Sequence, residues 1–188
     1  MRDREVMFRV FREFSAMTTP IKIAPISAKD IDIDVLEDTL SFYIRSINLA
    51  VSRDLDEKLD GLDVARGTGK ITTLFLVDGN PGIRPSTIAQ VIFKDRSAMG
   101  RLVDQMETHG LLRRETSSED SRAQELYITD KGSELAAHVR GIVTRQSREF
   151  FSEMTDDEHT LVMDILRRTY RRILTQSSSA GTAGNADA

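Results

Sequence analysis

One stretch of the chain decides its fold: DRSAMGRLVDQMETHGLLRR, residues 95–114. Apolar side chains recur in it every three or four positions, which predicts the buried face of an amphipathic helix. These side chains are Met99, Leu102, Val103 and Met106. Asp95 is a residue type that caps helix starts, and Gly110 one that ends helices. The stretch therefore predicts a helix over residues 96–109.

Short elements flank this helix on both sides. The expected neighbours are helices over residues 70–78 and 85–92 and strands over residues 111–116 and 124–128. Pro85 suits a first helical position, where its missing N–H costs nothing, and a polar cluster at 117–121 predicts the turn between the strands. Three short helices followed by a hairpin predict a winged helix-turn-helix over residues 67–130.

Longer helices are expected outside this lobe, so the fold class is mainly α with a small β-hairpin. Apolar residues recur with helical spacing over 34–59, 131–153 and 156–174. Asp34 with Glu37, and Thr155 with Glu158, have the spacing of capped helix starts. Residues 176–188 are too small and polar to bury a face, which predicts a disordered tail.

Charge is distributed unevenly along the 188 residues. The chain has 26 Lys and Arg against 30 Asp and Glu, and its net charge of -4 argues against a nucleic-acid partner when taken as a whole. Residues 28–64 hold ten acidic and four basic side chains, whereas residues 84–114 hold six basic and three acidic ones. The second segment includes the helix over 96–109. A basic lobe is therefore expected on an acidic helical frame.

The composition excludes several classes of protein. With no cysteine there is no disulfide, no thiolate nucleophile and no Cys-ligated zinc, which fits a cytoplasmic location. His109, His138 and His159 are too scattered to predict a metal site. Apolar runs are far shorter than the roughly 20 residues of a membrane span. No nucleophile–base pair or phosphate-binding loop is recognisable, so we expect neither an enzyme nor a bound cofactor.

The polar side of the helix over 96–109 has the composition of a base-reading surface. The major groove of B-DNA, about 12 Å wide, admits one helix. Arg101 suits bidentate bonds to guanine, and Ser97 suits a base or a phosphate. Polar residues of the neighbouring elements are expected at phosphates. The residues assigned to DNA contact on these grounds are Arg84, Ser86, Thr87, Lys94, Arg96, Ser97, Gly100, Arg101, Arg113 and Arg114.

Residues 88–132 resemble the MarR family of transcription regulators, and the wider resemblance covers about residues 36–174. The matching motifs are IAQ at 88–90, the stretch at 95–114, EDSR at 119–122 and LYITDKG at 126–132. The resemblance implies a homodimer whose two lobes read a pseudo-palindromic operator in double-stranded DNA. It also implies that Arg122 enters the minor groove or supports the wing together with Asp120.

The resemblance further implies a small-molecule effector, namely a small aromatic or phenolic acid or its thioester, bound between the dimerisation helices and the DNA-binding lobe. Tyr43, Ile47 and Phe75 are the expected lining residues, and Arg45 or Arg53 would hold an anion. For each of these residues an ordinary core or surface role stays open.

Structural explanations also stay open for the DNA-contact residues. Arg96 and Arg101 on one helix alone fit a solvated polar face, although the hairpin and the family motif favour DNA. Asp120 and Arg122 fit an ion pair at the hairpin tip worth less than about 1 kcal/mol, which is compatible with a DNA role.

The resulting interpretation is a ligand-responsive repressor. Its expected parts are an N-terminal arm (1–33), a dimerisation helix (34–66), the winged lobe (67–130), further dimerisation helices (131–175) and the tail (176–188). The alternative is a winged-helix module that binds another protein without reading bases, using the acidic segment at 28–64 as its partner surface.

Overall fold

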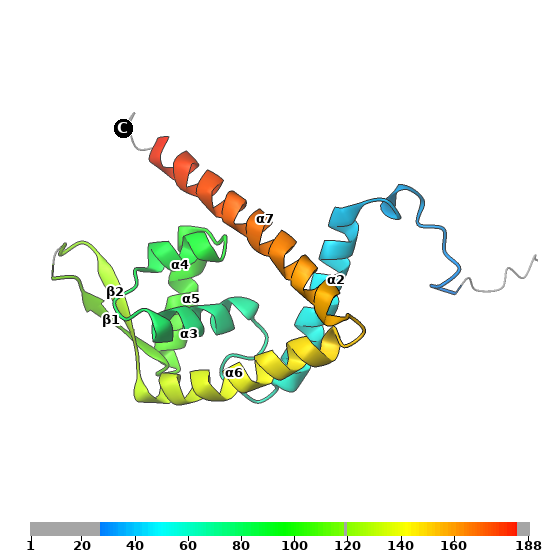
Figure 1. Ribbon diagram of the computed structural model, residues 1–188. Helices are drawn as coiled ribbons and strands as arrows, with labels where there is room; N and C mark the ends of the chain where they lie inside the picture. Colours follow the sequence, from blue (N-terminus) through cyan, green and yellow to red (C-terminus); the bar gives the residue numbers. More distant parts are fainter. Residues whose placement is uncertain (1–26, 119, 184–188) are drawn as a thin grey trace, which may run out of the picture. The chain divides into compact units, whose positions relative to one another are not determined.

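The structure is a computed structural model that describes residues 27–118 and 120–183. Contacts divide the chain into two units, residues 1–43 and 44–188. Most of the predicted N-terminal arm, up to residue 26, lies outside the described residues. The elements of the described part are shown in Figure 1.

The first unit contains the 3₁₀ helix η1 (Asp34–Leu36) and the start of α2 (Leu40–Lys58). The predicted helix start at Asp34 is wrong, because this residue makes no side-chain cap and has a φ of 50°. Its backbone N–H donates to Asp32 Oδ1 at 2.8 Å, a local turn that competes with the helix. The regular helix therefore begins six residues later, at Leu40.

The second unit holds the rest of α2 and seven further elements in the predicted order. They are α3 (Thr68–Gly79), α4 (Pro85–Val91), α5 (Arg96–Thr108), β1 (Leu112–Thr116), β2 (Gln124–Ile128), α6 (Asp130–Phe150) and α7 (Asp156–Ala183). Asp95 caps α5 by accepting the Ala98 N–H at 2.7 Å. Thr155 and Glu158 form the predicted capping box of α7: each side chain accepts the other residue's N–H, at 3.3 and 2.9 Å.

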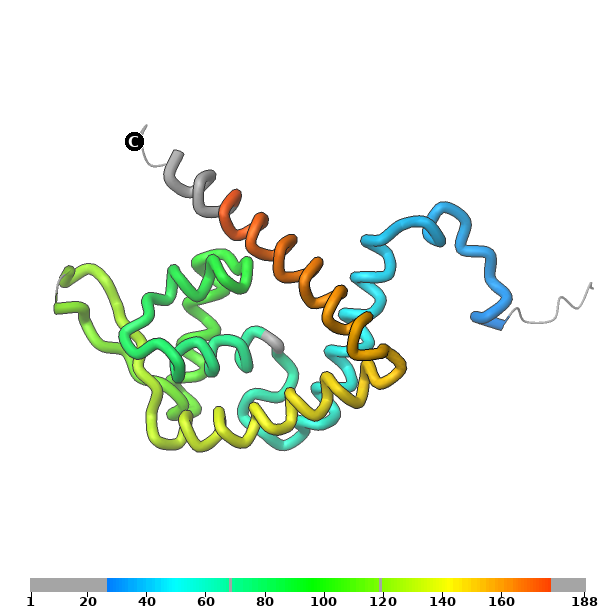
Figure 2. Tube along the Cα trace, viewed as in Figure 1, coloured from blue at the N-terminus to red at the C-terminus, as the bar shows by residue number. Residues whose placement is uncertain are grey.

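The core of this unit lies among α3, α4, α5, the hairpin and α6. Helix α6 runs beside α3 (Figure 2). The predicted inner face of α5 is buried in full. These side chains belong to the same buried cluster as completely buried residues elsewhere in the unit, among them Leu74, Ile88, Leu111, Leu126 and Val139. The amphipathic spacing of α5 thus places its polar side on the surface.

The hairpin is antiparallel, with Leu112 opposite Ile128, and it is fixed tightly to the start of α6. The hydroxyl of Thr129 donates to the Gly110 carbonyl at 2.6 Å and accepts the Gly132 N–H at 3.1 Å. A Cβ on Gly132 would overlap the Leu111 carbonyl oxygen. The glycine is therefore required by close backbone approach, which explains its place after the wing.

The end of the chain differs from the expectation of disorder from residue 176. Helix α7 continues to Ala183, and residues 184–188 lie outside the described part. Each residue added to a formed helix gains one backbone hydrogen bond, so a short Ser- and Ala-containing extension can follow the amphipathic portion. Within the described residues, none of the helices combines the length and hydropathy that crossing a membrane requires.

Candidate nucleic-acid interface

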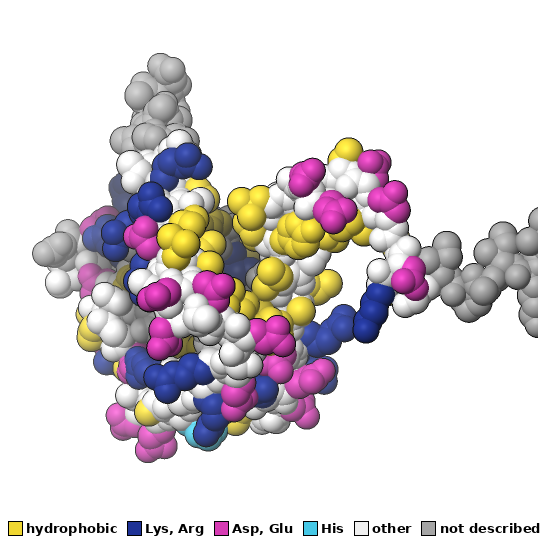
Figure 3. Space-filling view, turned by 45° about the vertical axis from the view of Figure 1, so that its right-hand side comes forward, with side chains coloured by type: hydrophobic (Ala, Val, Ile, Leu, Met, Phe, Trp, Pro, Cys, Tyr) yellow, Lys and Arg dark blue, Asp and Glu magenta, His cyan; other side chains and the backbone are white. Residues whose placement is uncertain are grey.

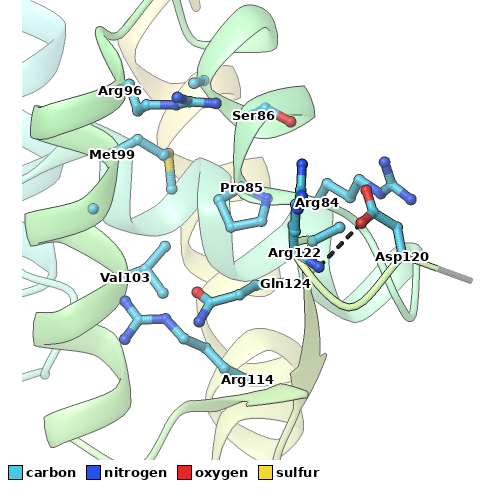
Figure 4. A pocket seen from close by; sticks show the side chains of 13 residues that line it. Arg84, Pro85, Ser86, Arg96, Met99, Val103, Arg114, Asp120, Arg122 and Gln124 are labelled. Carbon is cyan, nitrogen blue, oxygen red and sulfur yellow. Dashed lines mark hydrogen bonds between the residues drawn. The ribbon is translucent and has the colours of Figure 1, made fainter. Parts of the chain in front are cut away.

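The start of α4, the side of α5 that carries Arg96 and Gly100, and the hairpin surround a concavity of about 510 Å³ (Figure 4), which the buried Met99 and Val103 also line. Seven of the predicted DNA-contact residues line it: Arg84, Ser86, Arg96, Gly100, Arg114, Asp120 and Arg122. They come from the start of α4, from α5 and from the hairpin, all within residues 84–122. The fold therefore gathers cationic side chains where a recognition helix meets its wing.

The N-terminus of α5 is organised by Asp95. Its Oδ1 accepts the Ala98 N–H and the Ser97 hydroxyl, both at 2.7 Å, and these hydrogen bonds, that of Ala98 first, lower the pKa of the carboxyl. Ser97 is thus held by the cap while its own oxygen can still accept. Arg101 is exposed outside the concavity, on the solvent side of α5.

Arg113 and Arg114 lie on opposite faces of β1 and have different surroundings. The Arg114 guanidinium pairs with both Asp104 and Glu107 of α5, and its side chain is only 23% exposed. Arg113 pairs with Glu115, and its guanidinium carbon lies 5.0 Å from the centroid of the Tyr127 ring. Alternation of side chains along the strand puts the two arginines on opposite faces. Each of these two predicted DNA-contact residues thus has a partner within the protein.

The tip of the hairpin is shaped by Asp120. Its Oδ1 accepts the backbone N–H of Arg122 at 3.0 Å, and its carbonyl oxygen accepts the Ala123 N–H at 2.8 Å. The carboxylate therefore forms a turn with the backbone, and no ion pair engages the Arg122 guanidinium within the described residues. Figure 4 places Arg84, Asp120 and Arg122 at the same end of the concavity.

Thr87 and Lys94 lie outside the concavity. Thr87 is exposed on α4. Lys94 follows α4 and reaches the start of α3, since a Cβ built on Gly69 would lie 2.9 Å from Lys94 Cε. The cationic residues around the concavity are thus Arg84, Arg96 and Arg122, with Arg114 paired below them.

Comparison with known proteins agrees with this architecture. The MarR family profile matches residues 61–123, which include α3, α4, α5 and β1. The putative transcriptional regulatory protein for the hcr operon of Thauera aromatica is 29% identical over 71% of this chain and 80% of its own length. Over residues 61–123 the chain is thus similar to MarR-family regulators.

Two solved structures have the same fold as this protein. The transcriptional repressor CouR, bound to a 23-mer DNA duplex, superposes with a TM-score of 0.68 at 24% identity, covering 74% of this chain and 97% of CouR. The PcaV transcriptional regulator of Streptomyces coelicolor, in complex with its natural ligand, gives a TM-score of 0.65 at 19% identity, covering 78% and 96%.

Sequence reasoning did not single out two residues at or beside the concavity. Gln124 of β2 lines the concavity, and Glu107 of α5 accepts a hydrogen bond from Arg114, which also lines it. The alternating pattern of β2 could have indicated Gln124, because this residue lies on the same strand face as the buried Leu126. No sequence pattern indicates the second, which depends on how the hairpin docks on α5.

Within the described residues of the single chain, the predicted effector residues do not line one common cavity. In the second unit, Arg53 borders a concavity of about 640 Å³ along α2, and Phe75 borders another of about 290 Å³ between α2, α3 and α6. Arg45 and Ile47 are exposed and line neither. In the first unit, Tyr43 is 39% exposed beside the ring of Phe42.

Large apolar side chains are exposed along α2 and α7. Figure 3 colours the hydrophobic side chains on one face of the molecule yellow. On α2 they include Ile44 and Ile47, and on α7 Leu161, Ile165 and Leu166, each between 45 and 59% exposed. Large apolar residues repeated along helix faces mark an interaction surface rather than scattered surface residues. The apolar faces of α2 and α7 are therefore exposed in the single chain.

Proposed function

We propose that this protein regulates transcription by binding a specific sequence in double-stranded DNA through the concavity between α5 and the hairpin. The observation that carries the proposal is the convergence of Arg84, Arg96 and Arg122 from three elements on that concavity. Such cations neutralise phosphates on either side of a groove while α5 enters it. The net charge of -4 does not oppose this role, because the cations are concentrated locally.

Base reading is assigned to the exposed side of α5. Arg101 is exposed on α5, and it suits the two acceptors of guanine in the major groove. Arg122 at the hairpin tip is assigned to the minor groove, whose negative potential attracts arginine. The ion pairs of Arg114 with Asp104 and Glu107 are assigned to positioning the hairpin against α5.

The active form is proposed to be a homodimer on a pseudo-palindromic operator. The exposed apolar residues of α2 and α7 supply a surface that a second copy would cover, as isologous interfaces require. Two copies then present two α5 helices to half-sites one helical turn, about 10 bp, apart. Such a regulator reaches chromosomal DNA in the cytoplasm, and its role requires no catalytic step.

The regulator is proposed to be a repressor released by a small aromatic or phenolic acid or its thioester. The structure of PcaV holds its natural ligand, and in this protein the concavities bordered by Arg53 and by Phe75 offer a cation and an aromatic ring. An effector of this kind must bind the DNA-free arrangement of the lobes more tightly than the DNA-bound one. The complete site would form after dimerisation.

Selection of duplexes from a random pool by the purified protein tests this proposal. A pseudo-palindromic consensus whose binding weakens with salt is expected, because phosphate contacts release counterions. Enrichment of no sequence, or retention that salt does not change, would contradict it and favour a module that binds protein. Adding aromatic acids and their thioesters to the selected complex then tests release.

A further inference from the structure

The C-terminus of α4 has a bulky residue where helices usually have glycine. The Lys94 N–H donates to the Ala89 carbonyl at 2.9 Å and the Phe93 N–H to the Gln90 carbonyl at 3.3 Å, which is the hydrogen-bond pair of a Schellman motif. Phe93 occupies the left-handed position of that motif with a φ of 53°. This position favours glycine, because a Cβ crowds the neighbouring carbonyl there.

Burial does not account for the phenylalanine. The side chain is 51% exposed, so its position is not that of a core residue. An aromatic residue at positive φ costs free energy, and such a conformation persists when its surroundings hold it. The surroundings of Phe93 therefore decide what it does.

Helix α7 supplies those surroundings. The hydroxyl of Tyr170 donates to the Val91 carbonyl at 3.0 Å, across 79 positions of sequence. The rings of Tyr170 and Phe93 meet edge to face, with centroids 5.9 Å apart and planes at 85°. Carbonyls in the last turn of a helix have no partner within it. Tyr170 thus caps α4 from another element, while Phe93 packs on the same ring.

We propose that Val91, Phe93 and Tyr170 form a latch that holds the start of α5 at a set orientation to α7 and thereby sets the spacing between the two half-sites that the dimer reads. The inference rests on the proposed function. Only Lys94 and Asp95 separate Phe93 from Arg96, the first residue of α5. Tyr170 is a positioning residue, because it acts on DNA reading through the turn before α5.

The latch acts on spacing because α7 belongs to the helical region through which the two copies are expected to associate. A dimer tolerates only operators whose half-sites match the separation of its recognition helices. If the turn before α5 moves freely against α7, each lobe still reads its own half-site. The dimer then accepts a wider range of separations.

Two variants weaken the latch by different means. Tyr170→Phe removes the hydroxyl that caps Val91 and keeps the ring. Phe93→Gly removes the second ring and relieves the positive φ, so its thermal stability is expected to be equal to or higher than that of the natural protein. Thr175→Val is the matched control, because its hydroxyl bonds only to Arg171 within α7 in the described structure.

Binding is measured on the selected operator and on versions with one base pair added or removed between the half-sites. The natural protein and Thr175→Val are expected to discriminate roughly tenfold between these duplexes, and both latch variants roughly threefold or less, with base preference inside each half-site unchanged. Equal discrimination by all four proteins would overturn the latch. A uniform loss of affinity on every duplex would overturn it as well, since that outcome indicates a general structural role.

A measurement without DNA separates the two proposals. Because the chain has no cysteine, Thr108→Cys gives one spin label per chain at the end of α5. Adding Tyr170→Phe is expected to broaden the label-to-label distance distribution in the dimer, and an unchanged width contradicts the latch. A natural protein that neither dimerises nor selects DNA contradicts the proposed function instead.

Discussion

The guanidinium of Arg114 in β1 donates from Nη1 to Oε2 of Glu107 in α5 at 2.9 Å, and its other terminal nitrogen pairs with Asp104. The Arg114 backbone N–H also donates to Glu107, at 3.3 Å. One side chain of the wing is therefore fixed to two successive turns of the recognition helix. Because the arginine is mostly covered, these charge-assisted bonds are stronger than those of an exposed pair.

Replacing this arginine should loosen the wing. Arg114→Met keeps the aliphatic volume but leaves the two carboxylates without their cation, and we expect unfolding in urea to show a loss of about 1–3 kcal/mol. DNA affinity should fall for all sequences, because the wing loses its position. Arg113→Met is the control: its exposed ion pair is worth less than about 1 kcal/mol. Equal losses for the two variants would contradict the assignment.

Arg101 and Arg122 should affect DNA binding in different ways. Arg101→Ala is expected to cost about 1–3 kcal/mol on the selected operator and little on mismatched duplexes, because base contacts are lost. Arg122→Ala should weaken binding to most sequences and reduce the slope of log affinity against log salt by about 1. Titrations against matched and mismatched duplexes at several salt concentrations distinguish these effects. If neither variant alters affinity, the docking of α5 and the wing is wrong.

Gly132 should tolerate no side chain. In Gly132→Ala the new Cβ meets the Leu111 carbonyl, so strand or helix must shift, and we expect a destabilisation of about 1–3 kcal/mol by thermal or urea unfolding. Gly141 lies in the same helix with open space around its missing Cβ. Gly141→Ala should stabilise the protein by about 0.5–1 kcal/mol, because alanine favours the helix. A neutral Gly132→Ala would show that the hairpin exit is not tightly packed.

Stability should decline in acid partly through Asp95. The Ala98 N–H, followed by the Ser97 hydroxyl, lowers the pKa of this carboxyl below its ordinary value of 3.8. A folded-state pKa below the unfolded one adds stability at higher pH, and the contribution disappears as the pH falls through the folded value. Asp95→Asn keeps a capping oxygen but cannot titrate. Urea unfolding between pH 6 and 2.5 should therefore show a shallower acid decline for this variant than for the natural protein, and parallel curves would contradict the assignment.

Several helix faces and helix starts could be predicted because each depends on residues that are close together in the sequence. The repeat from Met99 to Met106 determined the buried face of α5, Asp95 its start and the Thr155–Glu158 pair the start of α7, all of which the structure confirms. The start of α2 was not predictable in this way. The competing turn at Asp34 offers the backbone a local alternative that residue spacing does not reveal.

Periodicity, caps and local charge act over a few residues, so most helices and strands and the basic character of the segment around α5 could be read from the amino-acid order. Which of those cations face the concavity and which are paired depends on how the elements pack. Arg114 turned inward to Glu107 because the hairpin folds back on α5, and Tyr170 reached Val91 because α7 packs beside α4. Contacts of this kind join residues far apart in the chain, and their partners are chosen by packing rather than by local pattern.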